Sequence, residues 1–179
     1  MQVLANFEVT RIQFVVKDDK YASIEKCHLQ PVNRSLKLFD LRIKLLQLPV
    51  TNALVKWSLL KRSNGYLPIN QNYTVDVCKF MQHSNHVFNN FIYSIFKDFT
   101  NLNHTCPFNV SSNYAVAYPH SFLFIAVCLQ HDIIVNKFPT RFVRAMDFIF
   151  IPRGDYAIDS AWYAGGVLRI EGRVKFTLL

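Results

Sequence analysis

Residues 36–46, LKLFDLRIKLL, decide the fold class, because apolar and polar residues alternate along this stretch. The apolar face carries Phe39, Leu41, Ile43 and Leu45. A side-chain period of two is typical of a β-strand with one buried face. A second alternating run covers residues 53–59, and the Pro- and Asn-bearing segment 48–52 lies between the two runs. We therefore predict a β-hairpin with one apolar face.

Most of the remaining chain extends this β pattern. Residues 73–80 are predicted to form a third strand, and residues 157–163 and 167–178 a second hairpin around Gly165 and Gly166. Residues 84–99 differ, because their apolar side chains recur at spacings of three and four, with Ser84 or Asn85 as the N-cap. The prediction is a mostly β chain with one amphipathic helix, forming a single domain over residues 1–179.

Composition narrows the class of protein. The chain is 51% hydrophobic and only 18% charged, so it is neither a disordered chain nor a coiled coil. Its formal net charge of +8 raises nucleic acid as a partner, but the basic residues are scattered and form no stripe, so we predict no nucleic-acid binding. The longest apolar run is too short for a membrane-spanning helix, which needs about 20 residues.

Two features predict a secreted protein. Asn33, Asn72 and Asn103 each begin an Asn-x-Ser/Thr sequon, which makes them the predicted glycosylation sites. The four cysteines include no CxxC pair, so disulfides are a better interpretation than a zinc site. We therefore expect an extracellular location, although the first eleven residues do not have the pattern of a signal peptide.

Motifs for catalysis are missing from the sequence. His83 and His86 are three residues apart, but no third ligand accompanies them, so we predict no metal site. There is no nucleophile elbow, phosphate-binding glycine loop or dinucleotide fingerprint, and carboxylates are sparse. We predict that the protein is not an enzyme and needs no cofactor.

Several phrases, taken together and in order, resemble a known family. They are CHL at 27–29, VNR at 32–34, LLQLPVTN at 45–52, KRSNGY at 61–66, TVDVCKFM at 74–81, NLNHTCPFN at 101–109, HDIIV at 131–135 and PRGDY at 152–156. In this order they resemble a large insect family of small secreted proteins of unknown function, related to chemosensory B-type proteins and assigned to the ML lipid-recognition superfamily. The resemblance implies an immunoglobulin-like (ML-type) antiparallel β-sandwich whose sheets part to hold a lipid or another apolar ligand.

The expected function follows from that resemblance and from the apolar faces. We expect a non-enzymatic binding protein for a lipid or other apolar small molecule, with a chemosensory role as one form of it. The candidate cavity residues are Leu41, Ile43, Val55, Trp57, Phe88, Phe91, Ile170 and Val174. The alternative is an extracellular protein-interaction domain with a fully packed core, whose basic faces meet an acidic protein or a membrane surface.

The cysteines depart from the family pattern. Phe14 stands where the family has a cysteine near the N-terminus, so Cys27 is expected to lack its usual partner. Cys78 and Cys106 flank the predicted helix and are therefore expected to pair. Cys128 is expected to be free or to form only a non-native bond.

Residues 110–130 also depart from the family pattern, because they separate the phrase that ends at Asn109 from the phrase that begins at His131. One explanation is a real apolar loop; the other is a translated intron. We favour the intron, because deleting residues 110–130 restores the family phrase and an exposed apolar loop promotes aggregation. On that interpretation Cys128 lies outside the disulfide framework.

Overall fold

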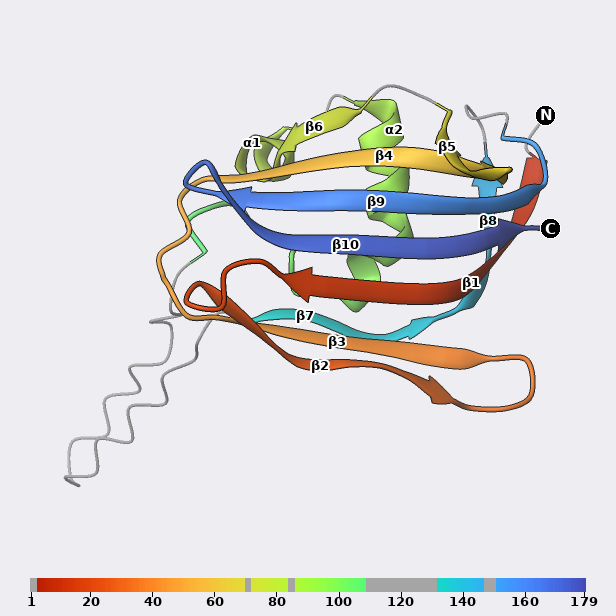
Figure 1. Ribbon diagram of the computed structural model, residues 1–179, viewed down its shortest axis with the longest axis horizontal. Coiled ribbons are helices and arrows are strands. Elements are labelled where there is room, and N and C mark those ends of the chain that lie inside the picture. Colours follow the sequence, from red (N-terminus) through yellow and green to blue (C-terminus); the bar gives the residue numbers. More distant parts are fainter. Residues whose placement is uncertain (1–2, 70–71, 84–85, 109–131, 147–150) are drawn as a thin grey trace.

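The computed structural model describes residues 3–69, 72–83, 86–108, 132–146 and 151–179. These residues form two antiparallel β-sheets packed face to face, with short helices at one side (Figure 1). The mostly β chain predicted from the alternating runs, and the antiparallel β-sandwich implied by the family resemblance, are therefore confirmed. The candidate insertion at residues 110–130 lies outside the described residues.

The larger sheet has the strand order β5-β4-β9-β10-β1-β8, and β6 also pairs with β4. Its strands are β1 (Val3–Val16), β4 (Ala53–Ser63), β5 (Gly65–Pro68), β6 (Tyr73–Asp76), β8 (Arg141–Met146), β9 (Gly154–Ala164) and β10 (Val167–Leu178). The smaller sheet has the order β2-β3-β7. Its strands are β2 (Ala22–Pro31), β3 (Lys37–Leu45) and β7 (Ile133–Pro139).

The stretch that predicted the fold class forms β3, the central strand of the smaller sheet. Its four alternating apolar side chains are all buried, and Ile43 is among the most deeply buried side chains described. Burial of a side chain of this size contributes about 1.5–3 kcal/mol. The β9–β10 hairpin is also confirmed, with Gly165 and Gly166 both at positive φ, as a two-residue turn of this kind requires.

The predicted pairing of residues 36–46 with 53–59 is wrong. β3 lies in the smaller sheet and β4 in the larger one, so the chain crosses between the sheets instead of turning back. Val50, midway along the crossing, pairs with Phe108 and not with a neighbouring strand. The physical reason is that both runs carry an apolar face. The two faces are buried by meeting across the core, about 10 Å apart, which side-by-side pairing does not achieve.

The predicted strand at 73–80 is also too long. β6 ends at Asp76, whose Oδ1 accepts a hydrogen bond of 3.1 Å from the backbone N–H of Lys79. This N-cap starts the short helix α1 (Val77–Gln82). The chain therefore changes from strand to helix just before Cys78.

The amphipathic helix at 84–99 is confirmed in type and shortened in extent. α2 covers Val87–Phe96, and the short 3₁₀ helix η1 (Lys97–Phe99) continues it. His86 is the N-cap, since its Nδ1 accepts a 3.4 Å hydrogen bond from the N–H of Asn89. Ser84 and Asn85, the predicted N-cap candidates, lie outside the described residues.

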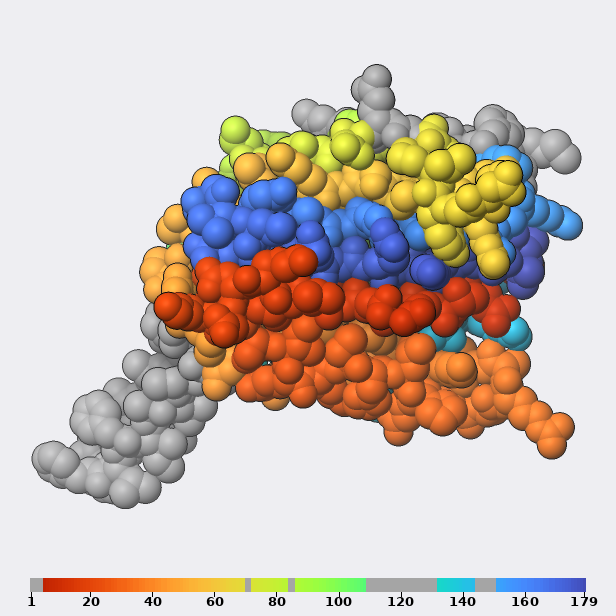
Figure 2. Space-filling view, in the orientation of Figure 1, coloured from red at the N-terminus to blue at the C-terminus, as the bar shows by residue number. Residues whose placement is uncertain are grey.

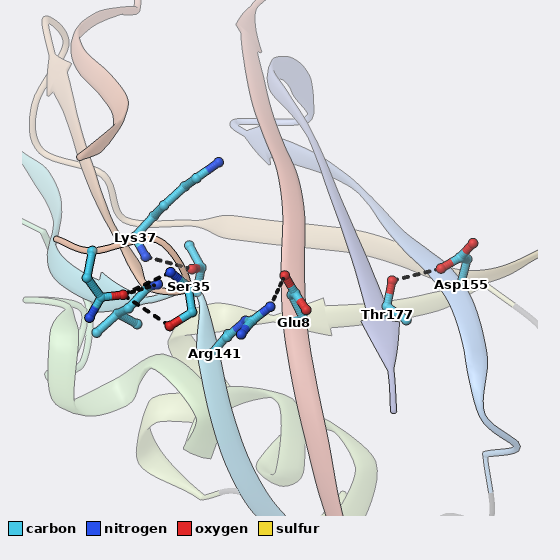
Figure 3. A network of polar contacts seen from close by, with 9 residues as sticks. Glu8, Ser35, Lys37, Arg141, Asp155 and Thr177 are labelled. Carbon is cyan, nitrogen blue, oxygen red and sulfur yellow. Dashed lines mark hydrogen bonds and ion pairs between the residues drawn. The ribbon is translucent and has the colours of Figure 1, made fainter. Parts of the chain in front are cut away.

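Polar contacts join neighbouring strands of the larger sheet (Figure 3). Arg141 on β8 donates a 2.8 Å hydrogen bond to Glu8 on β1, and Thr177 on β10 donates one of 2.7 Å to Asp155 on β9. Thr140 links the two sheets, because its carbonyl accepts from the N–H of Val9 at 2.7 Å and its own N–H donates to Lys37 at 2.9 Å. The sheets are thus fixed relative to each other where β7 leads into β8.

Candidate functional site

The eight predicted cavity residues all lie in the interior between the sheets. They come in pairs from β3, β4, α2 and β10, and all belong to the core or pack against it. Four are buried: Leu41, Ile43, Trp57 and Ile170. The other four are only half-buried: Val55, Phe88, Phe91 and Val174. The structure therefore brings these residues together, and the half-buried ones lie on β4, β10 and α2.

An aromatic cluster connects β4, β6 and α2 on one side of this interior. The ring centroids of Trp57 and Tyr73 are 4.7 Å apart, and those of Trp57 and Phe88 are 5.1 Å apart, both in stacked geometry. Tyr73 and Phe88 are 5.4 Å apart, which closes the triangle. Tyr73 was not among the predicted cavity residues. The signal that could have found it is its position opposite Trp57 in the register of β4 and β6.

The helical segment forms a side wall that reaches from one sheet to the other. At its start, Phe88 stacks on Trp57 of the larger sheet. At its end, the rings of Phe99 and Phe138 meet edge to face at 5.4 Å, and Thr100 pairs with Val135, so it reaches β7 of the smaller sheet. Figure 1 shows α2 behind β4, β9 and β10. The interior is therefore bounded by two sheets and, between β4 and β7, by a helix.

The helix α2 in this wall is incompletely buried. None of the residues of α2, all of which the structure describes, is buried. Its apolar stripe packs against the core but stays only partly buried along its whole length: Phe88, Phe91, Ile92, Ile95 and Phe96. Apolar surface in contact with water costs roughly 25 cal/mol per Å², so a molecule that covers this stripe gains free energy.

Small residues on the inner face of the larger sheet leave room for a single aromatic ring. Ser160 and Gly172 are paired neighbours, and Gly172 in turn pairs with Phe14. A Cβ on Gly172 would lie 2.7 Å from Cε1 of Phe14 and 2.8 Å from Oγ of Ser160. The Phe14 ring therefore occupies the space above the glycine. Glycine is required here because of this close approach.

One disulfide holds the helical wall in place. Cys78 on α1 and Cys106 are bonded, with their Cα atoms 5.2 Å apart, and the closed loop contains α2 and η1. Inside this loop, the hydroxyl of Tyr93 donates a 2.8 Å hydrogen bond to the carbonyl of Leu102. The predicted Cys78–Cys106 pairing is confirmed.

Cys27 is free, as predicted, and its position explains why. It pairs with Leu41 in the register of β2 and β3, and because β2 is an edge strand the Cys27 side chain remains exposed. Partial desolvation of the Cys27 thiol raises its pKa, and a hydrogen bond with the Phe14 backbone partly offsets this rise. Phe14 thus lies next to Cys27, where a partner cysteine would be needed. Cys128 lies outside the described residues.

The three predicted glycosylation sites are accessible. Asn33, Asn72 and Asn103 are all exposed. In the described part of the chain, no group of three or more His, Cys, Asp or Glu side chains is arranged to hold a metal ion. None of the described helices is long and apolar enough to cross a membrane.

The fold and the interior define a β-sandwich whose apolar interior is closed on one side by a disulfide-bonded helical segment. Residues 55–120 match the model of a family described as a protein of unknown function, DUF1091. The match begins within β4 and includes both bonded cysteines and α2, so it covers the helical wall and the strand on which that wall packs. No curated protein matches the chain.

Proposed function

We propose that this protein is a secreted, non-enzymatic binding protein for a lipid or another apolar small molecule, which it holds between α2 and the two sheets. The observation that carries the proposal is the incompletely buried apolar stripe of α2, which begins at Phe88 on the Trp57 ring. A helix that served only to complete the core would bury at least some residues of its stripe fully, and α2 buries none of them fully. The disulfide supports an oxidising, extracellular location.

The same helix also carries a buried polar group, the side-chain amide of Asn89. Oδ1 of Asn89 is buried and has no hydrogen-bond partner among the described residues. A buried acceptor without a donor costs about 1–3 kcal/mol. A ligand whose hydroxyl or protonated carboxyl group donates to this oxygen recovers that cost. The ligand class that fits best is therefore a long apolar chain with a single hydrogen-bond donor.

Titration with a fluorescent fatty-acid probe tests the proposal. The readout is fluorescence energy transfer from Trp57 and Trp162 to the probe. Phe91→Asp should weaken binding by roughly tenfold or more, because it places a charge in an apolar site. Asn90→Asp is the matched control, since it introduces the same residue at the next position of the helix, and should change the affinity less than about twofold.

The competing function is an extracellular protein-interaction domain with a packed interior. If no apolar probe binds at tens of micromolar while circular dichroism shows an intact fold, the proposed carrier function is wrong. Equal loss of affinity in Phe91→Asp and Asn90→Asp would place the binding somewhere other than the apolar stripe.

A further inference from the structure

The outer face of the larger sheet, opposite the apolar interior, carries a depression. This outer depression has a volume of about 460 Å³ and spans strands β1, β4, β9 and β10. Polar side chains make up much of its lining: Gln13, Lys56, Ser58, Asp159, Glu171 and Arg173. Figure 2 views the molecule from this side, with β5 in yellow extending over the blue strands β9 and β10. The volume is within the range of small-molecule sites, about 300–1,000 Å³.

The charges of the outer depression cancel, although the chain as a whole is strongly basic. Arg173 donates two hydrogen bonds of 2.5 Å to the carboxylate of Asp159, and this ion pair raises the pKa of Arg173. Glu171 pairs with Lys17 at 2.8 Å. Lys56 lies over the ring of Tyr163, 4.9 Å from its centroid.

This balance selects the chemistry of the occupant. An anion would meet the two carboxylates, a cation would meet the ammonium and guanidinium groups, and an apolar molecule would remove water from all four charges at a high cost. A neutral ligand with many hydroxyl groups uses the remaining donors and acceptors without disturbing the ion pairs. The lining is therefore complementary to a carbohydrate.

Asn72 lies at the same place. It lines the outer depression, is exposed, and begins the sequon completed by Thr74. The next residue, Tyr73, points inward to Trp57, so Asn72 and Thr74 lie on the outer side of the chain. An N-linked glycan on Asn72 would begin at the rim of a cavity with carbohydrate-binding chemistry.

We propose that the first sugars of an Asn72 glycan lie in the outer depression, which makes it an intramolecular carbohydrate site. This inference rests on the proposed secretion, because only a secreted chain receives such a glycan. The glycan would cover polar surface on the side of the sheet that the apolar ligand does not use. Asn33 is the internal comparison, because it lies in the turn between β2 and β3 and is not part of the lining.

The test uses the full chain secreted from eukaryotic cells, with occupancy of each sequon measured by peptide mass spectrometry. Enzymatic release of the glycan from native protein should be at least about tenfold slower at Asn72 than at Asn33, and equal at both after denaturation. Ala161→Trp fills the depression with a side chain and should abolish this difference. Val143→Trp, at an exposed strand position outside the lining, should retain it.

Two outcomes would overturn the inference while leaving the carrier function intact. One is an empty Asn72 beside an occupied Asn33; the other is equally fast release from both sites in the native protein. Secreted protein in which every sequon is unoccupied would also overturn the inference. The carrier function would not be affected, because the probe titration tests it independently.

Discussion

Removing the Cys78–Cys106 disulfide should lower the free energy of unfolding by about 3.5 kcal/mol. The two cysteines are 28 residues apart in the sequence. The chain-entropy relation for closing a loop of that length gives about 12 cal/mol/K, or about 3.5 kcal/mol at 25 °C. The double substitution Cys78→Ser with Cys106→Ser removes the bond without leaving an unpaired thiol.

The loss of stability should be concentrated in the helical segment. The loop contains α2, whose residues are all at least partly exposed, so side-chain packing alone is left to hold the helix when the bond is absent. Amide hydrogen exchange should therefore rise most in α1 and α2, and least in the β9–β10 hairpin. Affinity for the fatty-acid probe should fall in parallel, because the helical wall is one side of the site.

Urea denaturation at neutral pH without reductant measures the effect, and wild-type protein with reductant should reproduce it. Cys27→Ser is the control and should change the free energy of unfolding by less than about 0.5 kcal/mol, since this cysteine is free and exposed. A double variant as stable as the wild type would refute the reasoning. Exchange that rises uniformly over all strands would show that the disulfide supports the whole sandwich and not the helical wall.

Three further predictions concern the sheets. Phe14→Cys should oxidise spontaneously with Cys27, because the thiol already contacts the Phe14 backbone; a thiol titration that still finds Cys27 free would contradict this. Gly172→Ala should cost about 1–3 kcal/mol in urea denaturation, because its Cβ meets the Phe14 ring, and an unchanged midpoint would show that the ring moves aside. The backbone N–H of Lys137 donates a hydrogen bond to the Asp40 carboxylate and lowers the pKa of Asp40. The ionised carboxylate therefore stabilises the fold above about pH 4, and this contribution is lost as the pH falls through the lowered pKa. Asp40→Asn should therefore destabilise the protein at pH 7 and weaken its acid sensitivity, and identical pH profiles for the two proteins would rule out this role.

The alternation of Phe39, Leu41 and Ile43 was sufficient to predict a strand with one buried face. It was not sufficient to predict the partner of that face. The alternation is the same whether the two strands pair side by side, with a third element covering both faces, or pack face to face, and a connection of seven residues permits either. Only the sheet assignment, which depends on contacts distant in sequence, separates them.

Prediction of the interior from the sequence has the same limit. Phe88 and Phe91 could be placed in it because a stripe at helical spacing must face something apolar. The relation between Phe14 and Gly172 could not be predicted, since it depends on the pairing of the first strand with the last. That register includes a shift between Val9 and Arg11, which breaks the simple alternation of β1.

The helical wall and the strand walls differ in how freely their sequences can change. A residue on β4 or β10 must suit the backbone ladder, its cross-strand neighbours and the buried face at once. A helix satisfies its own backbone hydrogen bonds, so the ten residues of α2 are fixed to the sandwich by side chains and by one covalent bond. Replacing a phenylalanine of the stripe changes the shape of the interior without disturbing any sheet. On the proposed carrier function, substitutions in this one short segment would therefore change the preferred ligand while the sandwich remains the same.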